Sequence, residues 1–127
     1  MCKILDPSIW NKMFQDNLQL DVCCEYLRFI ECRLNHEPNT NCEIHHILPK
    51  SLDHNSEYSH ECVRLSYKDH YHAHLLLKEM FIAGSERRSM VYAAYRMSRY
   101  HDLATHISSD NYSKLKSEFR EVNELLS

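Results

Sequence analysis

Two helices are predicted in the first third of the chain from the spacing of its apolar residues. Asp6 can cap a helix that starts with a proline, because proline is tolerated in a first turn. The apolar residues that follow include Trp10 and Phe14, both expected in the core. From Leu20 onward, apolar residues recur after three, four, three and four positions, which is one stripe of an amphipathic helix ending near His36. The members of this stripe are Leu20, Cys23, Leu27, Ile30 and Leu34.

The middle of the chain has two short apolar runs separated by a polar stretch, which predicts a β-hairpin. Residues 42–48 and 62–66 read as its strands, joined by an unusually long turn. Ser66 can cap the following helix, with Asp69 at the third position in an arrangement like a capping box. We predict that this helix stops at Gly84, the only glycine in the chain.

Two more amphipathic helices are predicted after that glycine. The first covers residues 85–100, with Met90, Ala93, Ala94 and Met97 on one face and Arg88, Tyr92, Tyr95 and Arg99 on the opposite face. The second runs from about Ser109 or Asp110 to Leu126, with apolar positions at Leu115, Phe119, Val122 and Leu126. The pattern as a whole predicts an α+β fold that is mostly helical.

Composition fits a single globular domain over residues 1–127. Hydrophobic residues make up 43% and charged residues 26% of the chain, enough for one modest core but not for two. No secretory signal and no stretch of the roughly 20 apolar residues of a membrane span is evident. We therefore expect a cytoplasmic protein without a membrane partner, whose six cysteines are reduced thiols. For Cys42 and Cys62 we expect burial rather than zinc binding.

Charge is distributed unevenly along the chain. The net charge of −3 argues against a protein whose whole surface grips nucleic acid. The first 45 residues carry seven acids and four bases, whereas the segment 85–101 carries four arginines and one acid. An anionic partner is therefore expected at the later part of the chain. The side chains there, among them Arg88, Tyr92, Arg96 and Arg99, read either as a nucleic-acid surface or as a solvated face whose tyrosines pack on a neighbour.

Histidines are unusually abundant, with ten in the chain. His70 and His74 are four apart on a predicted helix, so their rings share one face and can bind one metal ion, although such a pair also arises by chance. His45 and His46 are adjacent on a predicted strand, so their side chains point to opposite faces. If strand and helix pack together, one of these two completes a three-histidine site and the other is a nearby proton acceptor. The remaining central histidines are expected in solvent: His54, His60 and His72.

Three stretches of the sequence together resemble a known nuclease motif. They are HHILPKS at residues 45–51, VRLS at 63–66 and DHYHAHLLL at 69–77. In order and spacing they resemble the HNH endonucleases of the ββα-metal (His-Me finger) class, most closely the small phage-encoded, homing-type enzymes. The resemblance covers roughly residues 42–82. It implies a ββα-metal core at residues 42–83, flanked by helices at 1–38 and at 85–127.

By position, the resemblance implies that His45, His70 and His74 bind one divalent metal ion and that His46 is the general base. In such a site the base removes a proton from water while the metal offsets charge on the phosphate. Three imidazoles suit zinc, nickel, cobalt or manganese better than magnesium. The resemblance thus implies an endonuclease or nickase that hydrolyses DNA phosphodiester bonds in the cytoplasm of a phage-infected bacterial cell.

The sequence departs from the family at the middle of the motif. The asparagine that braces the long loop, and so helps to aim the base, should fall at Glu61; an ionised glutamate accepts hydrogen bonds but donates none. Its charge would also lie near an incoming phosphate. Cationic surface beside the histidines is still expected from Lys50, Arg64 and Lys68.

Two alternatives to the nuclease therefore stay open. One is a catalytically weakened or inactive HNH-derived module that binds DNA or a host protein. The other is a purely structural zinc protein, which would unfold on chelation and would not bind DNA. A protein partner or a homodimer is compatible with each of these.

Overall fold

The computed structural model describes residues 3–38, 41–99 and 109–124, with side chains in the last segment described for residues 113–123. These segments form five α-helices, three short 3-10 helices and one two-stranded antiparallel sheet, so the predicted mostly helical α+β class is confirmed. The α-helices are α1 (Pro7–Phe14), α2 (Leu20–Asn35), α3 (Tyr67–Met80), α4 (Gly84–Arg99) and α5 (Ser109–Glu124). The strands are β1 (Glu43–His46) and β2 (Cys62–Leu65), and the 3-10 helices are η1 (Lys3–Leu5), η2 (Gln15–Asn17) and η3 (Lys50–Leu52).

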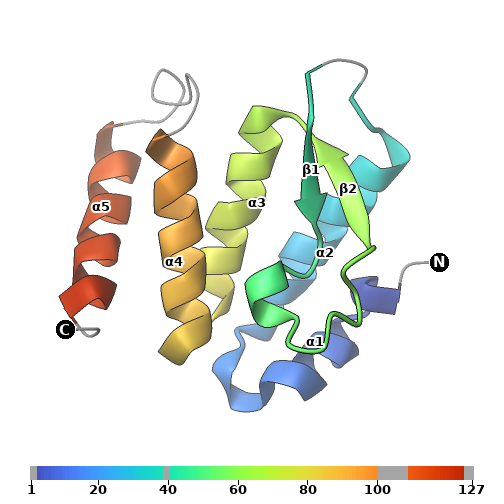
Figure 1. Cartoon of the computed structure of the whole chain (residues 1–127), viewed down its shortest axis with the longest axis horizontal. Helices are drawn as coiled ribbons and strands as arrows, with labels where there is room; N and C mark the ends of the chain where they lie inside the picture. Colours follow the sequence, from blue (N-terminus) through green and yellow to red (C-terminus); the bar gives the residue numbers. More distant parts are fainter. Residues whose placement is uncertain (1–2, 39–40, 100–108, 125–127) are drawn as a thin grey trace.

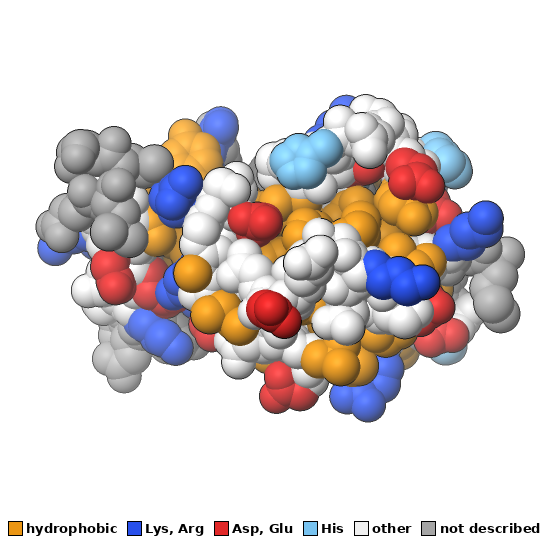
Figure 2. All heavy atoms as spheres, turned by 90° about the horizontal axis from the view of Figure 1, so that it is seen from below, with side chains coloured by type: hydrophobic (Ala, Val, Ile, Leu, Met, Phe, Trp, Pro, Cys, Tyr) orange, Lys and Arg blue, Asp and Glu red, His pale blue; other side chains and the backbone are white. Residues whose placement is uncertain are grey.

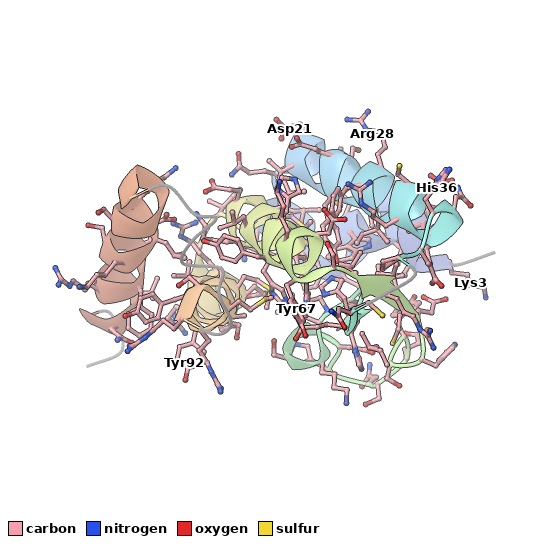
Figure 3. The ribbon with its side chains drawn as sticks, turned by 90° about the horizontal axis from the view of Figure 1, so that it is seen from above. Lys3, Asp21, Arg28, His36, Tyr67 and Tyr92 are labelled. Atoms are coloured by element: carbon pink, nitrogen blue, oxygen red, sulfur yellow. The ribbon has the colours of Figure 1, made fainter. Side chains whose placement is uncertain are left out.

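Helix α3 lies at the centre of the molecule. Helices α4 and then α5 pack side by side on one side of it, whereas α1, α2 and the hairpin lie on the other side (Figure 1). Seen from above, Asp21 and Arg28 project from α2 at one edge of the molecule, and Tyr92 projects from α4 at the opposite edge (Figure 3). The hairpin and α4 are therefore each in direct contact with the helix that carries two of the predicted ligands.

The predicted N-terminal helices are confirmed, and they build the main core. Asp6 caps α1, its carboxylate accepting from the Ser8 backbone N–H at 3.0 Å. Trp10 is fully buried, as expected, and its indole N–H donates to the Ile4 carbonyl at 2.7 Å, which satisfies the one polar group of the ring. Beside it lie buried side chains from α2, the hairpin and α3, among them Tyr26, Ile30, Val63, Leu77 and Met80. This core is what holds α3 against the hairpin.

Helix α3 ends earlier than predicted. It ends at Met80 rather than at Gly84, because the Met80 carbonyl accepts from the Gln19 backbone N–H at 2.8 Å and Phe81 forms an antiparallel bridge with Leu18. Contacts distant in sequence thus stop the helix before the glycine is reached. Gly84, at φ +79°, instead begins α4 in a conformation that side chains rarely adopt.

Helix α5 is attached by a small apolar cluster and by ion pairs. The cluster consists of Tyr71, Ala94 and Leu115, one from each of α3, α4 and α5. Next to it, the buried Lys78 ammonium lies 2.9 Å from Glu118 Oε1, and Arg87 lies 3.2 Å from Glu118 Oε2. The predicted helix ends at Tyr100 and Leu126 lie outside the described residues.

Apolar side chains at the lower end of the molecule are dispersed. Figure 2, a view from below, shows them in several patches separated by charged and other polar groups. None of the helices in the described segments combines the length and the apolar character that crossing a membrane requires.

Candidate metal centre

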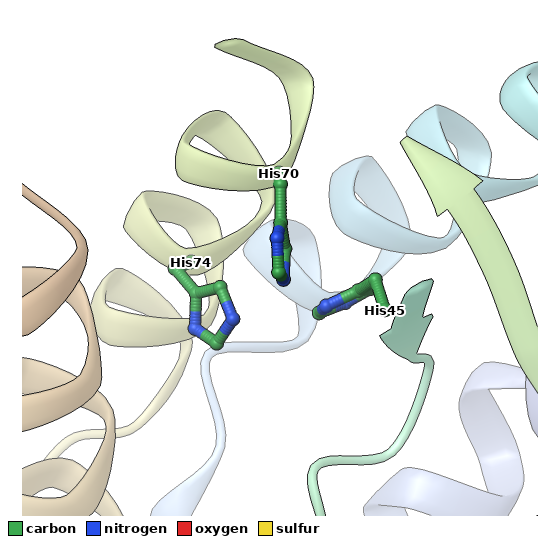
Figure 4. Close-up of side chains that lie close together, drawn as sticks. All are labelled: His45, His70 and His74. Carbon is green, nitrogen blue, oxygen red and sulfur yellow. The ribbon is translucent and has the colours of Figure 1, made fainter. Parts of the chain in front are cut away.

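Three histidine side chains from two elements converge between the hairpin and α3. His45 comes from β1, and His70 and His74 come from successive turns of α3. Their ring centroids are separated by 4.9 Å (His45 to His70), 4.9 Å (His70 to His74) and 5.2 Å (His45 to His74). One ring nitrogen of each lies within 4.8 Å of those of the other two, and the rings border one common space (Figure 4). The structure thus brings together the three residues that the sequence predicted as ligands.

Local backbone geometry explains why these three side chains meet. The Ser66 hydroxyl accepts from the Asp69 backbone N–H at 3.2 Å, the predicted cap, so α3 starts at a fixed residue. His70 and His74 then follow on one face, one turn apart. The pleat of β1 turns the His45 side chain inward, where His45 is only 2% exposed. In the hairpin, His45 is paired with Val63 of β2.

A tyrosine on α2 sets the orientation and the tautomer of His45. The buried Tyr26 hydroxyl donates to the Ile47 carbonyl at 2.7 Å, and its oxygen lies 2.7 Å from His45 Nε2. The hydroxyl has one proton and the carbonyl has none, so Nε2–H of His45 must donate to the hydroxyl oxygen. The lone pair of His45 is then on Nδ1, the atom that can bind a cation. Burial raises the pKa of Tyr26 well above its ordinary value, so the hydroxyl keeps its proton.

A carboxylate has the same role behind His70. Glu43 Oε1 lies 3.0 Å from His70 Nδ1, and the His70 side chain is 13% exposed. Donation from Nδ1–H to the carboxylate leaves the lone pair on Nε2. Partners of this kind hold a histidine ligand in place and increase its basicity. Glu43 is two residues before His45 on β1, so both side chains lie on the same face of the strand.

Burial keeps two of the rings neutral. Removal from water, reinforced by the neighbouring histidines, lowers the pKa of His45 well below 6.5 and lowers the pKa of His74 to about 3. Neutral imidazole is the form that binds metals. In addition, His74 Nδ1 is buried without a hydrogen-bond partner among the described residues, a situation that costs roughly 1–3 kcal/mol. A cation bound between the rings would offset part of this cost.

These observations fit a divalent cation of the zinc type. Tetrahedral bonds of about 2.0–2.1 Å place neighbouring nitrogens about 3.3 Å apart, so the ring nitrogens would approach one another by up to about 1.5 Å to bind an ion. Three protein ligands are typical of catalytic zinc sites, whereas structural sites have four. Among the described residues, the cluster of possible ligands contains these three histidines alone. Magnesium, which prefers oxygen ligands, fits the site less well.

His46 lies on the opposite face of β1 from His45, as strand alternation requires. It is half-buried, and its Nδ1 lies 3.8 Å from the sulfur of Cys62, its cross-strand partner. The Cys62 thiol donates to the Ser59 carbonyl, also at 3.8 Å. The sulfur can then accept from His46 Nδ1–H, which leaves the Nε2 lone pair able to take a proton. The expectation that Cys42 and Cys62 are buried is wrong, because both are half-buried.

The loop between the strands is braced by a residue other than Glu61. Asp53, 8% exposed, accepts from the backbone N–H groups of Glu57 at 3.0 Å and Tyr58 at 2.9 Å. Glu61 contributes its main chain, whose carbonyl accepts from the Ile47 N–H at 3.1 Å. Its carboxylate oxygen Oε2 is buried without a hydrogen-bond partner in the described part of the chain. The loop is therefore braced by the side chain of Asp53, and Glu61 Oε2 takes no part in this.

Sequence reasoning missed three of these supporting residues. Glu43 was detectable in principle, because it shares a strand face with His45. Asp53 is a residue type that commonly caps turns, so its place in the polar loop was a usable signal. Tyr26 carried no signal, since it falls beside the apolar stripe of α2 and reads only as a core residue.

The predicted cationic side chains lie on two surfaces. Three are exposed near the hairpin, namely Lys50 of η3, Arg64 of β2 and Lys68 of α3. On α4, the exposed residues are Tyr92, Arg96 and Arg99, and Arg88 is half-buried. Tyr92 is 50% exposed, whereas Tyr95 stacks on Phe119 of α5, so the packing expected for the tyrosines of this stripe is confirmed for Tyr95 and the nucleic-acid surface stays a prediction. The histidines expected in solvent, His54, His60 and His72, are exposed.

Comparisons of the chain with protein-family models, with curated proteins and with solved structures found no match.

Proposed function

We propose that this chain is a metal-dependent nuclease of the HNH type, which hydrolyses phosphodiester bonds in DNA. The observation that carries the proposal is the His45, His70 and His74 cluster, placed by a hairpin and the helix that follows it. Two further features support a working site. Tyr26 and Glu43 direct the lone pairs of two of the rings, and three ligands leave coordination positions for water and substrate.

Each histidine has a distinct role in the proposed reaction. His45, His70 and His74 would hold one divalent ion, which supplies positive charge to the phosphate oxygens and to the leaving oxygen. His46 takes the proton from the attacking water, and Cys62 keeps its Nε2 available for this. In the described two-stranded sheet, one edge of β1 is not paired with a strand. A phosphate bound at that edge can be reached both by a metal held at His45 on one face of β1 and by His46 on the other face.

The experiment compares plasmid cleavage by the wild type, His46→Ala and His54→Ala, with manganese, zinc or magnesium and with a chelator. His54, an exposed loop histidine, is the matched control. Loss of a general base should lower the cleavage rate by about 100- to 10,000-fold without weakening metal binding, whereas His54→Ala should cleave like the wild type. Equal cleavage by wild type and His46→Ala would remove His46 from the mechanism. Absence of metal-dependent cleavage by the wild type would refute the proposed nuclease activity.

A second candidate is a binding module that derives from such a nuclease and has lost cleavage. It is favoured by Glu61, which stands at the family's asparagine position and has a carboxylate oxygen buried without a partner. An asparagine there can both donate and accept and carries no charge toward a phosphate. Cleavage gained by Glu61→Asn would support this candidate, and robust cleavage by the wild type would exclude it.

A further inference from the structure

A groove lined by aromatic rings and arginines follows the contact between α4 and α5. Its cavity of about 470 Å³ is lined by Tyr92, Tyr95, Arg96, Arg99 and Phe119, and this volume is within the range of small-ligand sites. Tyr95 and Phe119 stack with centroids 4.1 Å apart and planes at 8°, which fixes one wall. Tyr92, 50% exposed, leaves much of its ring open to a ligand.

The charges of the groove select an anion. The guanidinium carbons of Arg96 and Arg99 each lie 5.8 Å from a tyrosine ring centroid, over Tyr92 and Tyr95 respectively. Arg99 also donates to the Tyr95 hydroxyl at 3.4 Å, so its head group is held at the groove. Flat apolar rings with cations beside them match a ligand that joins planar rings to negative charges.

The groove continues along the helices. A second hollow of about 350 Å³ shares Tyr92 and Phe119 with the first and reaches Arg88. From Arg88 to Arg99 the axis of α4 rises about 16 Å, a path long enough for several linked units and too long for one small molecule.

We propose that this groove binds single-stranded or locally melted nucleic acid, with bases stacked on Tyr92 and phosphates held by Arg88, Arg96 and Arg99. Stacking of this kind requires unpaired bases, because a duplex keeps the faces of its bases covered. Tyr92 projects to the same edge of the molecule as the hairpin (Figure 3), so one strand can contact both. The inference rests on the proposed function, since it names the form of nucleic acid that the nuclease engages.

The experiment measures binding by the full chain without metal, so that cleavage plays no part. Fluorescence anisotropy compares a labelled thymine 15-mer with a duplex of the same length. The wild type should prefer the single strand, and Tyr92→Ala should weaken its binding roughly 5- to 150-fold, whereas Tyr92→Phe should retain it. Arg99→Gln should reduce the slope of log affinity against log salt by about 0.7. Arg28→Ala, at the opposite edge of the molecule, is the charge control.

Three outcomes would overturn the inference. They are equal or stronger binding of the duplex, unchanged binding by Tyr92→Ala, and tighter binding of polyglutamate than of the oligonucleotide. Circular dichroism melts of each variant separate lost binding from lost folding, and Tyr92→Phe keeps the ring should alanine unfold the chain. Binding of the single strand without cleavage would contradict the proposed nuclease activity but support the proposed groove. Cleavage by the wild type, combined with unchanged binding by Tyr92→Ala, would contradict the groove alone.

Discussion

The variant Tyr26→Phe, which lacks one oxygen atom, tests how Tyr26 supports the candidate metal centre. The Tyr26 hydroxyl is fully buried and lies 2.7 Å from both the Ile47 carbonyl and His45 Nε2. Phenylalanine fills the same space but leaves two buried polar groups unsatisfied. Each costs roughly 1–3 kcal/mol, so we expect the free energy of unfolding to fall by about 2–4 kcal/mol once the site relaxes.

The same change should weaken metal binding. Loss of a partner behind a histidine ligand typically lowers metal affinity about 10- to 100-fold, and without the hydroxyl His45 is no longer restricted to the tautomer that leaves Nδ1 available. Urea unfolding followed by circular dichroism measures the stability of the metal-free protein. Competition with a chromophoric chelator measures zinc affinity.

The chain offers a closely matched control in Tyr71→Phe. The Tyr71 hydroxyl is also buried, but it has no hydrogen-bond partner among the described residues. Its removal should change stability by less than about 0.5 kcal/mol, or increase it, and should leave zinc affinity unchanged. Reduced stability of Tyr26→Phe with wild-type zinc affinity would refute the tautomer argument, because the hydroxyl would then serve only the Ile47 carbonyl.

Two further predictions concern stability. Because burial lowers the folded-state pKa of His74 to about 3 and lowers that of His45, the unfolded chain binds more protons below about pH 6.5. The free energy of unfolding of the metal-free protein should therefore be highest above that pH and should fall below it. His74 alone should lower it by about 2 kcal/mol near pH 5. An unchanged urea midpoint between about pH 7.5 and 5 would contradict this. Lys78→Ala should cost about 2–4 kcal/mol in the same urea assay, because Lys78 is 4% exposed and pairs with Glu118, whose remaining ion-pair partner among the described residues is Arg87. Lys114→Ala, at a residue 68% exposed and 3.9 Å from Glu79, should cost less than about 0.5 kcal/mol, and equal costs for the two lysines would refute the burial argument.

Local patterns were sufficient to predict the order of elements and the convergence of the three histidines. The cap at Ser66, the four-residue spacing of His70 and His74, and the inward pleat of His45 each depend on short-range geometry. The hairpin and α3 then needed only to pack together, which their apolar residues ensure.

Long-range contacts account for what the sequence did not reveal. The end of α3 is set by Gln19 and Leu18, some sixty residues away in the chain, and not by the nearby Gly84. Tyr26 of α2 contacts His45 of β1, and Phe119 stacks on Tyr95 only because α5 returns alongside α4. Partnerships of this kind leave no periodic trace in one sequence.

The weak attachment of α5 lets the groove between α4 and α5 come apart independently of the histidine cluster. Its small apolar cluster and its ion pairs with Lys78 and Arg87 are a weaker hold than the large core around Trp10 and Tyr26. Local unfolding should therefore release α5 before the histidine cluster loses its shape. Withdrawal of Phe119 would then remove one wall of the groove while the three histidine rings kept their arrangement. The nucleic-acid binding that we propose for the groove should therefore weaken with rising salt and temperature before the histidine cluster loses its ability to hold a cation.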